Sequence, residues 1–325
     1  MEYELLWKFV TYIYYIGGLL LILKVYNTVT AGVCKTDKRL DGQVIIVTGS
    51  NTGIGKTAAF DFAKRGAKVI LACRDLVKAH KTKDEIVEIT NNKNVVVRHL
   101  DLSSLKSVRQ FASEIIATEN RLDVLVNNAG LGGIVDKKTE DGLEWALQVN
   151  HYGHFLLTNL LIDLLKKSAP SRIVHVSSMM HWLGRLDFDN MNFEKGINGF
   201  MIYNVSKLYN IIGSNEFARR LEGTGVTSNS LHPGIVHTEI MREVPFLIRQ
   251  FVNKMLQLFF KSPEEGAQTT IYLAVNDEVT NVSGKYYSDC QEAYSSSITK
   301  DKEAGKKFWD KCCDFVHLKP EERFI

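Results

Sequence analysis

A tyrosine and a lysine four residues apart are the side chains of this 325-residue chain best suited to proton transfer. Tyr203 and Lys207 stand in the run Tyr-Asn-Val-Ser-Lys, which follows a long loop. Residues i and i+4 share one face of a helix, so we expect the phenol and the ammonium group to point into one site. Tyrosine titrates near pH 10 in water, and a neighbouring cation favours its phenolate. Tyr203 could then exchange a proton with a substrate oxygen.

This spacing also occurs by chance, and its ordinary alternative is a surface helix with a packed tyrosine. Ser178 favours the catalytic interpretation, because it ends an apolar run one connection upstream of the pair. A hydroxyl at that strand end can reach the same substrate oxygen from another direction.

Short β-branched runs alternate with longer helical patterns between residues 43 and 289. Apolar runs without polar alternation are typical of buried parallel strands. The expected strands are 44–48, 68–73, 95–100, 122–126, 172–177, 226–232 and 285–287. The expected helices are 53–64, 76–88, 104–118, 142–166, 203–222 and 263–275. The sequence therefore predicts one α/β domain of the doubly wound Rossmann type, with a mostly parallel seven-stranded sheet.

The first expected strand runs into a glycine-rich turn and then a helix. Glycines leave room for a pyrophosphate to approach the backbone at a helix N-terminus. A glycine-rich turn alone is a weak signal, but the strand, turn and helix together predict a dinucleotide site. The expected cofactor-binding residues of this turn are Gly49, Ser50, Asn51, Thr52, Gly53, Ile54 and Gly55.

The residues after the second strand bear on coenzyme choice. NAD sites typically place a carboxylate there, whereas Arg74 can bind a 2′-phosphate through its planar guanidinium. NADP(H) is therefore favoured and NAD(H) is the alternative. Asp75 beside Arg74 complicates this assignment, and Arg74 as a solvated loop charge is the other interpretation.

Two further loops are expected at the same edge of the sheet, where ligands bind. Asp101, followed by Leu102, closes the third strand and is placed to meet the adenine. Asn128, Ala129 and Gly130 follow the fourth strand.

Seven motifs stand in an order typical of one family. They are TGSNTGIG, LDLSS, NNAG, QVNHYGHFLLT, RIVHVSS, YNVSKL and HPGIVHTE. Over about residues 41–288 the chain resembles the short-chain dehydrogenase/reductases, and within them the membrane-anchored branch similar to retinol dehydrogenases. Activity as an oxidoreductase is the function that this resemblance implies.

The resemblance also implies roles for individual residues. Ser178 would hydrogen-bond the substrate oxygen, Tyr203 would be the acid/base, and Lys207 its electrostatic partner and a ribose ligand. Asn150 would support a proton relay to solvent. The remaining cofactor contacts implied are Asn128, Ala129, Gly130, Pro233, Gly234, Ile235 and Thr238. Members that use NADP often carry a second basic residue in the glycine turn, where this chain has Thr52, so Arg74 must secure the phosphate almost alone.

The N-terminal segment differs from the rest of the chain. Residues 9–23 carry no charge, and with flanking Lys8 and Lys24 the usable span extends to about residues 5–26, which predicts a membrane helix. A cleaved signal peptide and a buried helix are the alternatives. Glu2 and Glu4 precede the segment and basic residues follow it, so the downstream domain is expected to face the cytosol. The endoplasmic reticulum is the expected location.

The sequence thus divides into an anchor and linker at 1–40, a catalytic domain at 41–290 and a C-terminal tail at 291–325.

Residues 241–261 interleave apolar and basic side chains where a lid over the substrate would lie. A lid beside an anchor fits a lipophilic alcohol or carbonyl compound, while a helix packed on the domain is the alternative. The Lys-rich run at 300–311 could cover the substrate or lie on a membrane.

Composition narrows the list of partners. Lys plus Arg number 40 and Asp plus Glu 37, a balance too even to indicate nucleic acid. Five cysteines without a Cys-x-x-Cys pair indicate free thiols and no metal site. A homo-oligomer is compatible with the sequence. Two alternatives to the implied function remain. One is an NAD-linked steroid or other lipid alcohol dehydrogenase, and the other is a non-catalytic cofactor-binding scaffold.

Overall fold

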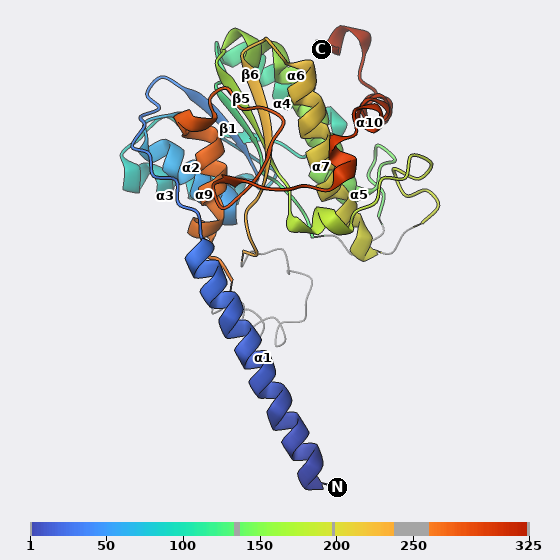
Figure 1. Ribbon diagram of the computed structural model, residues 1–325. Helices are drawn as coiled ribbons and strands as arrows, with labels where there is room; N and C mark the ends of the chain where they lie inside the picture. The colour runs from blue at the N-terminus through green and yellow to red at the C-terminus, as the bar shows by residue number, and fades with distance from the viewer. Residues whose placement is uncertain (1, 133–136, 197–198, 237–259, 324–325) are drawn as a thin grey trace.

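The computed structural model describes residues 2–132, 137–196, 199–236 and 260–323. An eight-stranded sheet lies between two layers of helices (Figure 1). The strands are β1 (Val44–Thr48), β2 (Lys68–Cys73), β3 (Val95–His99), β4 (Val124–Asn127), β5 (Ser171–Val176), β6 (Val226–His232), β7 (Tyr286–Ser288) and β8 (Gln291–Glu292). Their spatial order is β3-β2-β1-β4-β5-β6-β7-β8.

Helices cover both faces of this sheet, while α1 (Glu2–Thr30) extends away from it. The helices of the domain include α2 (Gly53–Lys64), α3 (Leu76–Thr90), α4 (Leu105–Thr118), α5 (Trp145–Leu147), the π-helix η1 (Gln148–Tyr152), α6 (Gly153–Lys167), the 3-10 helix η2 (Met179–Leu183), α7 (Gly199–Arg220), α9 (Pro263–Val275) and α10 (Lys302–Phe315). One core lies between the sheet and α2, α3 and α9, and the other between the sheet and α4, α6, α7 and α10.

The predicted Rossmann-type fold with a mostly parallel sheet is confirmed, but the expected strand number is one too low. Strands β1 to β7 pair in parallel, and β8 adds an antiparallel edge. Strand β8 has two exposed residues, Gln291 and Glu292, and therefore leaves no hydrophobic pattern in the sequence. Every residue of β1 is buried, which explains its uninterrupted apolar run.

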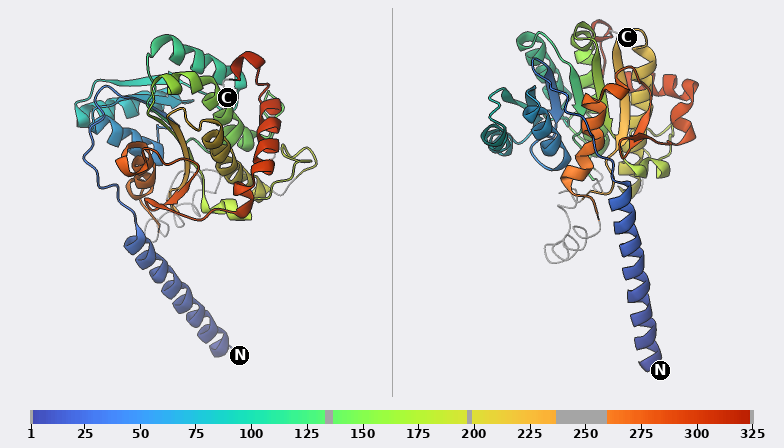
Figure 2. Two further views of the ribbon diagram at one scale, coloured as in Figure 1. Left: turned by 45° about the horizontal axis from the view of Figure 1, so that its top comes forward. Right: turned by 60° about the vertical axis from the view of Figure 1, so that its left-hand side comes forward.

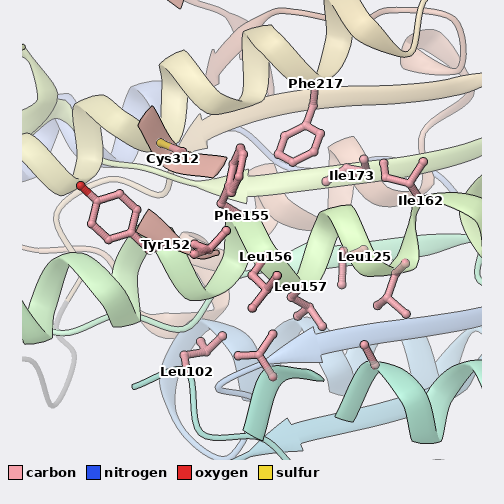
Figure 3. Close-up of a cluster of buried hydrophobic side chains, with 14 of the residues drawn as sticks. Leu102, Leu125, Tyr152, Phe155, Leu156, Leu157, Ile162, Ile173, Phe217 and Cys312 are labelled. Atoms are coloured by element: carbon pink, nitrogen blue, oxygen red, sulfur yellow. The ribbon is translucent and has the colours of Figure 1, made fainter. Parts of the chain in front are cut away.

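The C-terminal segment contributes to the core of the domain. Trp309 of α10 packs edge-on against Phe155 of α6 and Phe217 of α7, with ring centroids 4.8 Å apart in both pairs. Figure 3 shows Cys312 beside Phe155 in the same cluster. The sequence allowed residues 300–311 either to cover the substrate or to lie on a membrane. In the structure this segment packs on α6 and α7.

Helix α1 extends away from the domain in all three views (Figures 1 and 2). It carries exposed apolar side chains, among them Trp7, Tyr12, Leu19 and Ile22. A helix at this position is confirmed. None of the helices in the described residues combines the length and the apolar character needed to cross a bilayer, so the predicted membrane-spanning property is not found.

Candidate active site

The glycine turn lies against the loop that follows β4. A Cβ atom added to Gly49 would stand 2.9 Å from the Cα atom of Ala129, and Gly49 has a φ of +64°. A Cβ atom on Gly55 would stand 2.4 Å from Nδ2 of Asn128 and 2.7 Å from the carbonyl oxygen of Gly49. These two glycines therefore allow the loops to approach each other, a requirement in addition to the room for a pyrophosphate expected from the sequence.

The start of α2 is suited to a phosphate group. Within the described part of the chain, the side chain of the N-cap residue Thr52 makes no capping hydrogen bond, and the first turn holds no acidic residue. The first backbone N–H groups of a helix lack intrahelical partners and carry partial positive charge. The residues present thus fit the pyrophosphate of a dinucleotide, as the sequence predicts.

Replacing Gly55 with alanine tests this packing. The added methyl group would meet the carbonyl oxygen of Gly49 and force the turn to shift, so we expect a loss of about 1–3 kcal/mol of stability and weaker coenzyme binding. Thermal unfolding and coenzyme titration measure both effects. Gly18→Ala in α1 is the matched control, since its Cβ atom has open space. Equal behaviour of the two variants would contradict the assigned role of Gly55.

Thr48 connects the two loops, and the sequence did not single it out. Its Oγ1 atom accepts hydrogen bonds from the backbone N–H groups of Asn128 and Ala129, both at 2.9 Å. Nε2 of His154 lies 2.8 Å from the same Oγ1 atom. Burial lowers the pKa of His154 to about 3, so the imidazole is neutral at physiological pH. The position of Thr48 at a strand end beside the first glycine was the available signal.

Ser178 and Tyr203 meet at the carboxyl edge of the sheet. Ser178 follows β5 and caps η2, and Tyr203 lies on α7. Burial raises the pKa of Tyr203 above its usual value, and the nearby Ser178 side chain lowers it by a smaller amount. The expectation that Tyr203 is made acidic is therefore wrong for the protein alone: its phenol is protonated at neutral pH.

Lys207 lies beside Tyr203, as the i, i+4 spacing predicts. Its Nζ atom is 5.5 Å from the centroid of the Tyr203 ring and donates a hydrogen bond to the carbonyl oxygen of Val176 at 3.1 Å. Burial lowers the pKa of Lys207 to about 8, so the amine still carries its charge at pH 7.

Asn150 lies close to Lys207 because of a local irregularity in the helix. The helix expected at 142–166 runs from residue 145 to residue 167, and residues 148–152 within it form the π-helix η1 between α5 and α6. The Asn150 amide donates to the carbonyl of Leu131 at 3.0 Å and to Oγ of Ser206 at 2.9 Å, and its Oδ1 accepts from the N–H of Leu131 at 2.7 Å. π-Helical turns often occur at functional sites. Ser206 is a contact that the sequence did not suggest.

Gly130 lies between these polar groups. A Cβ atom on Gly130 would stand 3.4 Å from Nζ of Lys207 and 3.5 Å from Oδ1 of Asn150. Ser178, Tyr203, Lys207 and Asn150 are therefore brought together on the side of the sheet that carries the glycine turn.

The residues predicted to meet the adenosine half of the coenzyme lie at the ends of β2 and β3. Arg74 is exposed and makes no hydrogen bond or ion pair within the described residues. The Asp75 carboxylate accepts from the N–H of Lys78 and caps α3. Asp101 accepts hydrogen bonds from the backbone and hydroxyl of Ser103 at 2.9 and 2.6 Å, and Leu102 is buried.

The segment after β6 is described as far as residue 236. Gly234 has a φ of +88°, and a Cβ atom on it would lie 2.6 Å from Cδ of Lys261. The N–H of Lys261 donates to the carbonyl of Ile235 at 3.0 Å, and Pro233 precedes this contact. Thr238 and residues 241–259 of the expected lid lie outside the described residues.

Other aromatic and histidine side chains near the site pack in the interior. His151, Tyr152, His175 and His181 are buried. Nδ1 of His181 lies 2.7 Å from the carbonyl oxygen of Ser178, which holds the start of η2.

A doubly wound sheet with a glycine turn and a Ser, Tyr and Lys cluster at its carboxyl edge defines a class of nucleotide-dependent oxidoreductase. The family model described as short chain dehydrogenase matches residues 43–245. The chain belongs to the short-chain dehydrogenase family and is an oxidoreductase.

Retinol dehydrogenases are among the relatives of this chain. It is 45% identical to retinol dehydrogenase 11 of Mus musculus over 295 residues, which cover 91% of this chain and 93% of the relative. It is 44% identical to retinol dehydrogenase 13 of Homo sapiens over 308 residues, which cover 93% of this chain and 92% of the relative. A solved protein from Escherichia coli CFT073, described as a short chain dehydrogenase complexed with NADPH, has a TM-score of 0.61 and 25% identity, covering 78% of this chain and 99% of that one.

Proposed function

We propose that this protein is an NADP(H)-dependent oxidoreductase that interconverts a lipophilic alcohol and its aldehyde or ketone, with retinol and retinal as the first substrate class. The observation that carries the proposal is the placement of Ser178 near Tyr203, with Lys207 beside the phenol ring. Relatives named retinol dehydrogenases support the substrate class.

In the proposed reaction, Ser178, Tyr203 and Lys207 have different roles at the carbonyl group. The hydroxyl groups of Ser178 and Tyr203 bind the substrate oxygen from two directions, and Tyr203 gives its proton to that oxygen. The coenzyme, when bound, supplies the hydride to the carbonyl carbon. Lys207 holds positive charge beside the phenol and stabilises the phenolate left behind.

Carbonyl reduction is the direction that suits this site. Burial raises the pKa of Tyr203, so the phenol is a proton donor at neutral pH. Alcohol oxidation would need the phenolate, which an oxidised nicotinamide would have to stabilise. The protonated phenol therefore supports carbonyl reduction as the proposed direction.

A substrate panel tests the proposed function. Purified full-length protein is assayed with NADPH or NADH at equal concentration against retinal, long-chain aldehydes and ketosteroids. We expect retinal to be reduced with NADPH. Turnover confined to steroids with NAD would support the alternative of a steroid alcohol dehydrogenase, and coenzyme binding without any turnover would support a non-catalytic scaffold.

Arg74 is proposed to select NADP(H) over NAD(H). Its exposed guanidinium has no protein partner in the described residues, and Asp75 is held by α3. We expect Arg74→Ser to weaken NADPH binding about 100-fold and to leave NADH binding within about twofold, the size of a lost charge-assisted hydrogen-bond pair. Arg185→Ser, at another exposed arginine, is the control. An unchanged preference in Arg74→Ser would reject this role.

We also propose that α1 attaches the protein to the membrane of the endoplasmic reticulum with the catalytic domain in the cytosol. The exposed aromatic and aliphatic side chains of α1 and the basic residues Lys24 and Lys35 after its acidic start support this. Microsomes treated with protease should lose the domain without detergent. Protection of the domain in intact microsomes would contradict this orientation.

A further inference from the structure

The C-terminal end of α1 lies at the carboxyl edge of the sheet, which we call the catalytic edge because Ser178 lies there. Helix α1 ends at Thr30, and two residues later the N–H of Gly32 donates to Oδ1 of Asp289 at 3.4 Å. Asp289 directly follows Ser288, the last residue of β7. Because β5, β6 and β7 run in parallel, this contact lies at the edge where Ser178 and the cofactor loops lie.

Exposed apolar side chains gather at the same edge, and we call them the apolar rim. The apolar rim consists of Val33, Met179, Trp182 and Leu183. Three of these belong to η2, which begins directly after Ser178.

The structure places η2 next to the catalytic tyrosine. A Cβ atom on Gly184, at the end of η2, would stand 2.8 Å from the carbonyl oxygen of Asn204 and 2.9 Å from Cβ of Leu208. Asn204 follows Tyr203 on α7. Trp182 and Leu183 are nevertheless 55% and 53% exposed, so no element among the described residues covers these apolar side chains.

The end of α1 and the apolar rim both lie at the carboxyl edge of the sheet. We propose that the apolar rim rests on the surface of a lipid bilayer, with η2 between the headgroups, so that the catalytic edge faces the membrane. Exposed apolar side chains on α1 begin at this edge, so the helix and the rim can reach the same apolar phase. The exposed cations Lys35 and Arg185, next to the rim along the chain, suit anionic headgroups. The inference rests on the proposed function, since a lipophilic carbonyl would enter from that surface.

Fluorescence quenching tests the contact directly. Full-length protein is reconstituted into vesicles of phosphatidylcholine and phosphatidylserine with brominated acyl chains, and compared with Trp182→Phe. The other tryptophans, Trp7, Trp145 and Trp309, are common to both proteins. We expect the quenched component to be larger in the parent than in Trp182→Phe. Equal quenching in the two proteins would overturn the proposal.

Kinetics test the consequence for substrate delivery. Leu183→Glu is compared with Ile116→Glu, which makes the same kind of change at a 55% exposed residue near the end of α4, away from the catalytic edge. We expect Leu183→Glu to raise the apparent KM for retinal in vesicles about fivefold and to leave the KM for albumin-bound retinal unchanged. Ile116→Glu should change neither value. Equal effects of the two variants would refute the rim as a delivery surface.

The outcomes separate this inference from the proposed function. If no carbonyl compound is reduced, the proposed function fails, and the Trp182 quenching still decides whether the rim meets lipid. If retinal is reduced while Trp182 is not quenched, the rim proposal fails alone. A dimer in detergent that Leu183→Glu dissociates, without quenching in the parent, would assign the rim to a second copy of the chain and overturn the lipid contact.

Discussion

Replacing Tyr203 with phenylalanine is expected to lower kcat/KM for retinal reduction about a thousandfold, the scale of a lost general acid. The phenol is protonated at neutral pH because burial raises its pKa, so it can give a proton to the substrate oxygen. The ring remains in the variant, so the packing on Lys207 and the binding of NADPH should persist.

The matched control for this substitution lies on the same helix. Tyr209 is buried in α7 and donates its hydroxyl to the carbonyl of Met191 at 3.4 Å. Tyr209→Phe removes an equivalent oxygen, and we expect a stability loss of about 1 kcal/mol with activity retained. Steady-state kinetics and NADPH titration on both variants decide the matter. A fully active Tyr203→Phe enzyme, or a Tyr209→Phe enzyme that is equally impaired, would remove the basis for the assignment.

Replacing Lys207 with methionine is expected to lower kcat/KM about a hundredfold by removing the charge beside the phenol. Methionine keeps the apolar stem, so the buried side chain is largely replaced in volume. The hydrogen bond to the carbonyl of Val176 is lost as well. Lys285→Met is the control, because its ion pair with Glu292 is exposed and lies on the β7–β8 edge.

The pH profile of kcat/KM tests whether the lost charge of Lys207 is the reason for the lower activity expected of Lys207→Met. Burial lowers the pKa of Lys207 to about 8, so the cation is present below that pH and is lost as the pH rises through it. We expect kcat/KM of the parent enzyme, which reports on the free enzyme, to fall above about pH 8. This decline should be absent in Lys207→Met. A parent profile that is flat to pH 10 would show that the cation is not required.

The regular parts of the fold follow from local sequence. Strands β1, β2 and β6 and helices α2 and α9 begin and end where the sequence predicts, because buried β-branched runs end at turn residues. The Tyr203 and Lys207 pair is also predictable, since i and i+4 share a face in any helix. The glycine turn is identified by its position between a strand and a helix.

Other features depend on contacts between distant segments. The π-helix around Asn150 leaves no trace in the hydrophobic period, because its five residues are all buried. Thr48 binds Asn128 and Ala129 across about eighty positions, and no local pattern reports such a pair. The raised pKa of Tyr203 depends on burial by the whole domain, whereas the sequence shows the neighbouring lysine alone.

The transfer of deuterium from coenzyme to product tests the central claim most directly. NADPH that carries deuterium at both C4 positions of the nicotinamide is mixed with retinal and the purified full-length protein, and the retinol is analysed by mass spectrometry. The site described above predicts one deuterium atom per retinol molecule in the parent and almost no labelled product with Tyr203→Phe. Retinol without the label, or equal labelled product from both proteins, would contradict it.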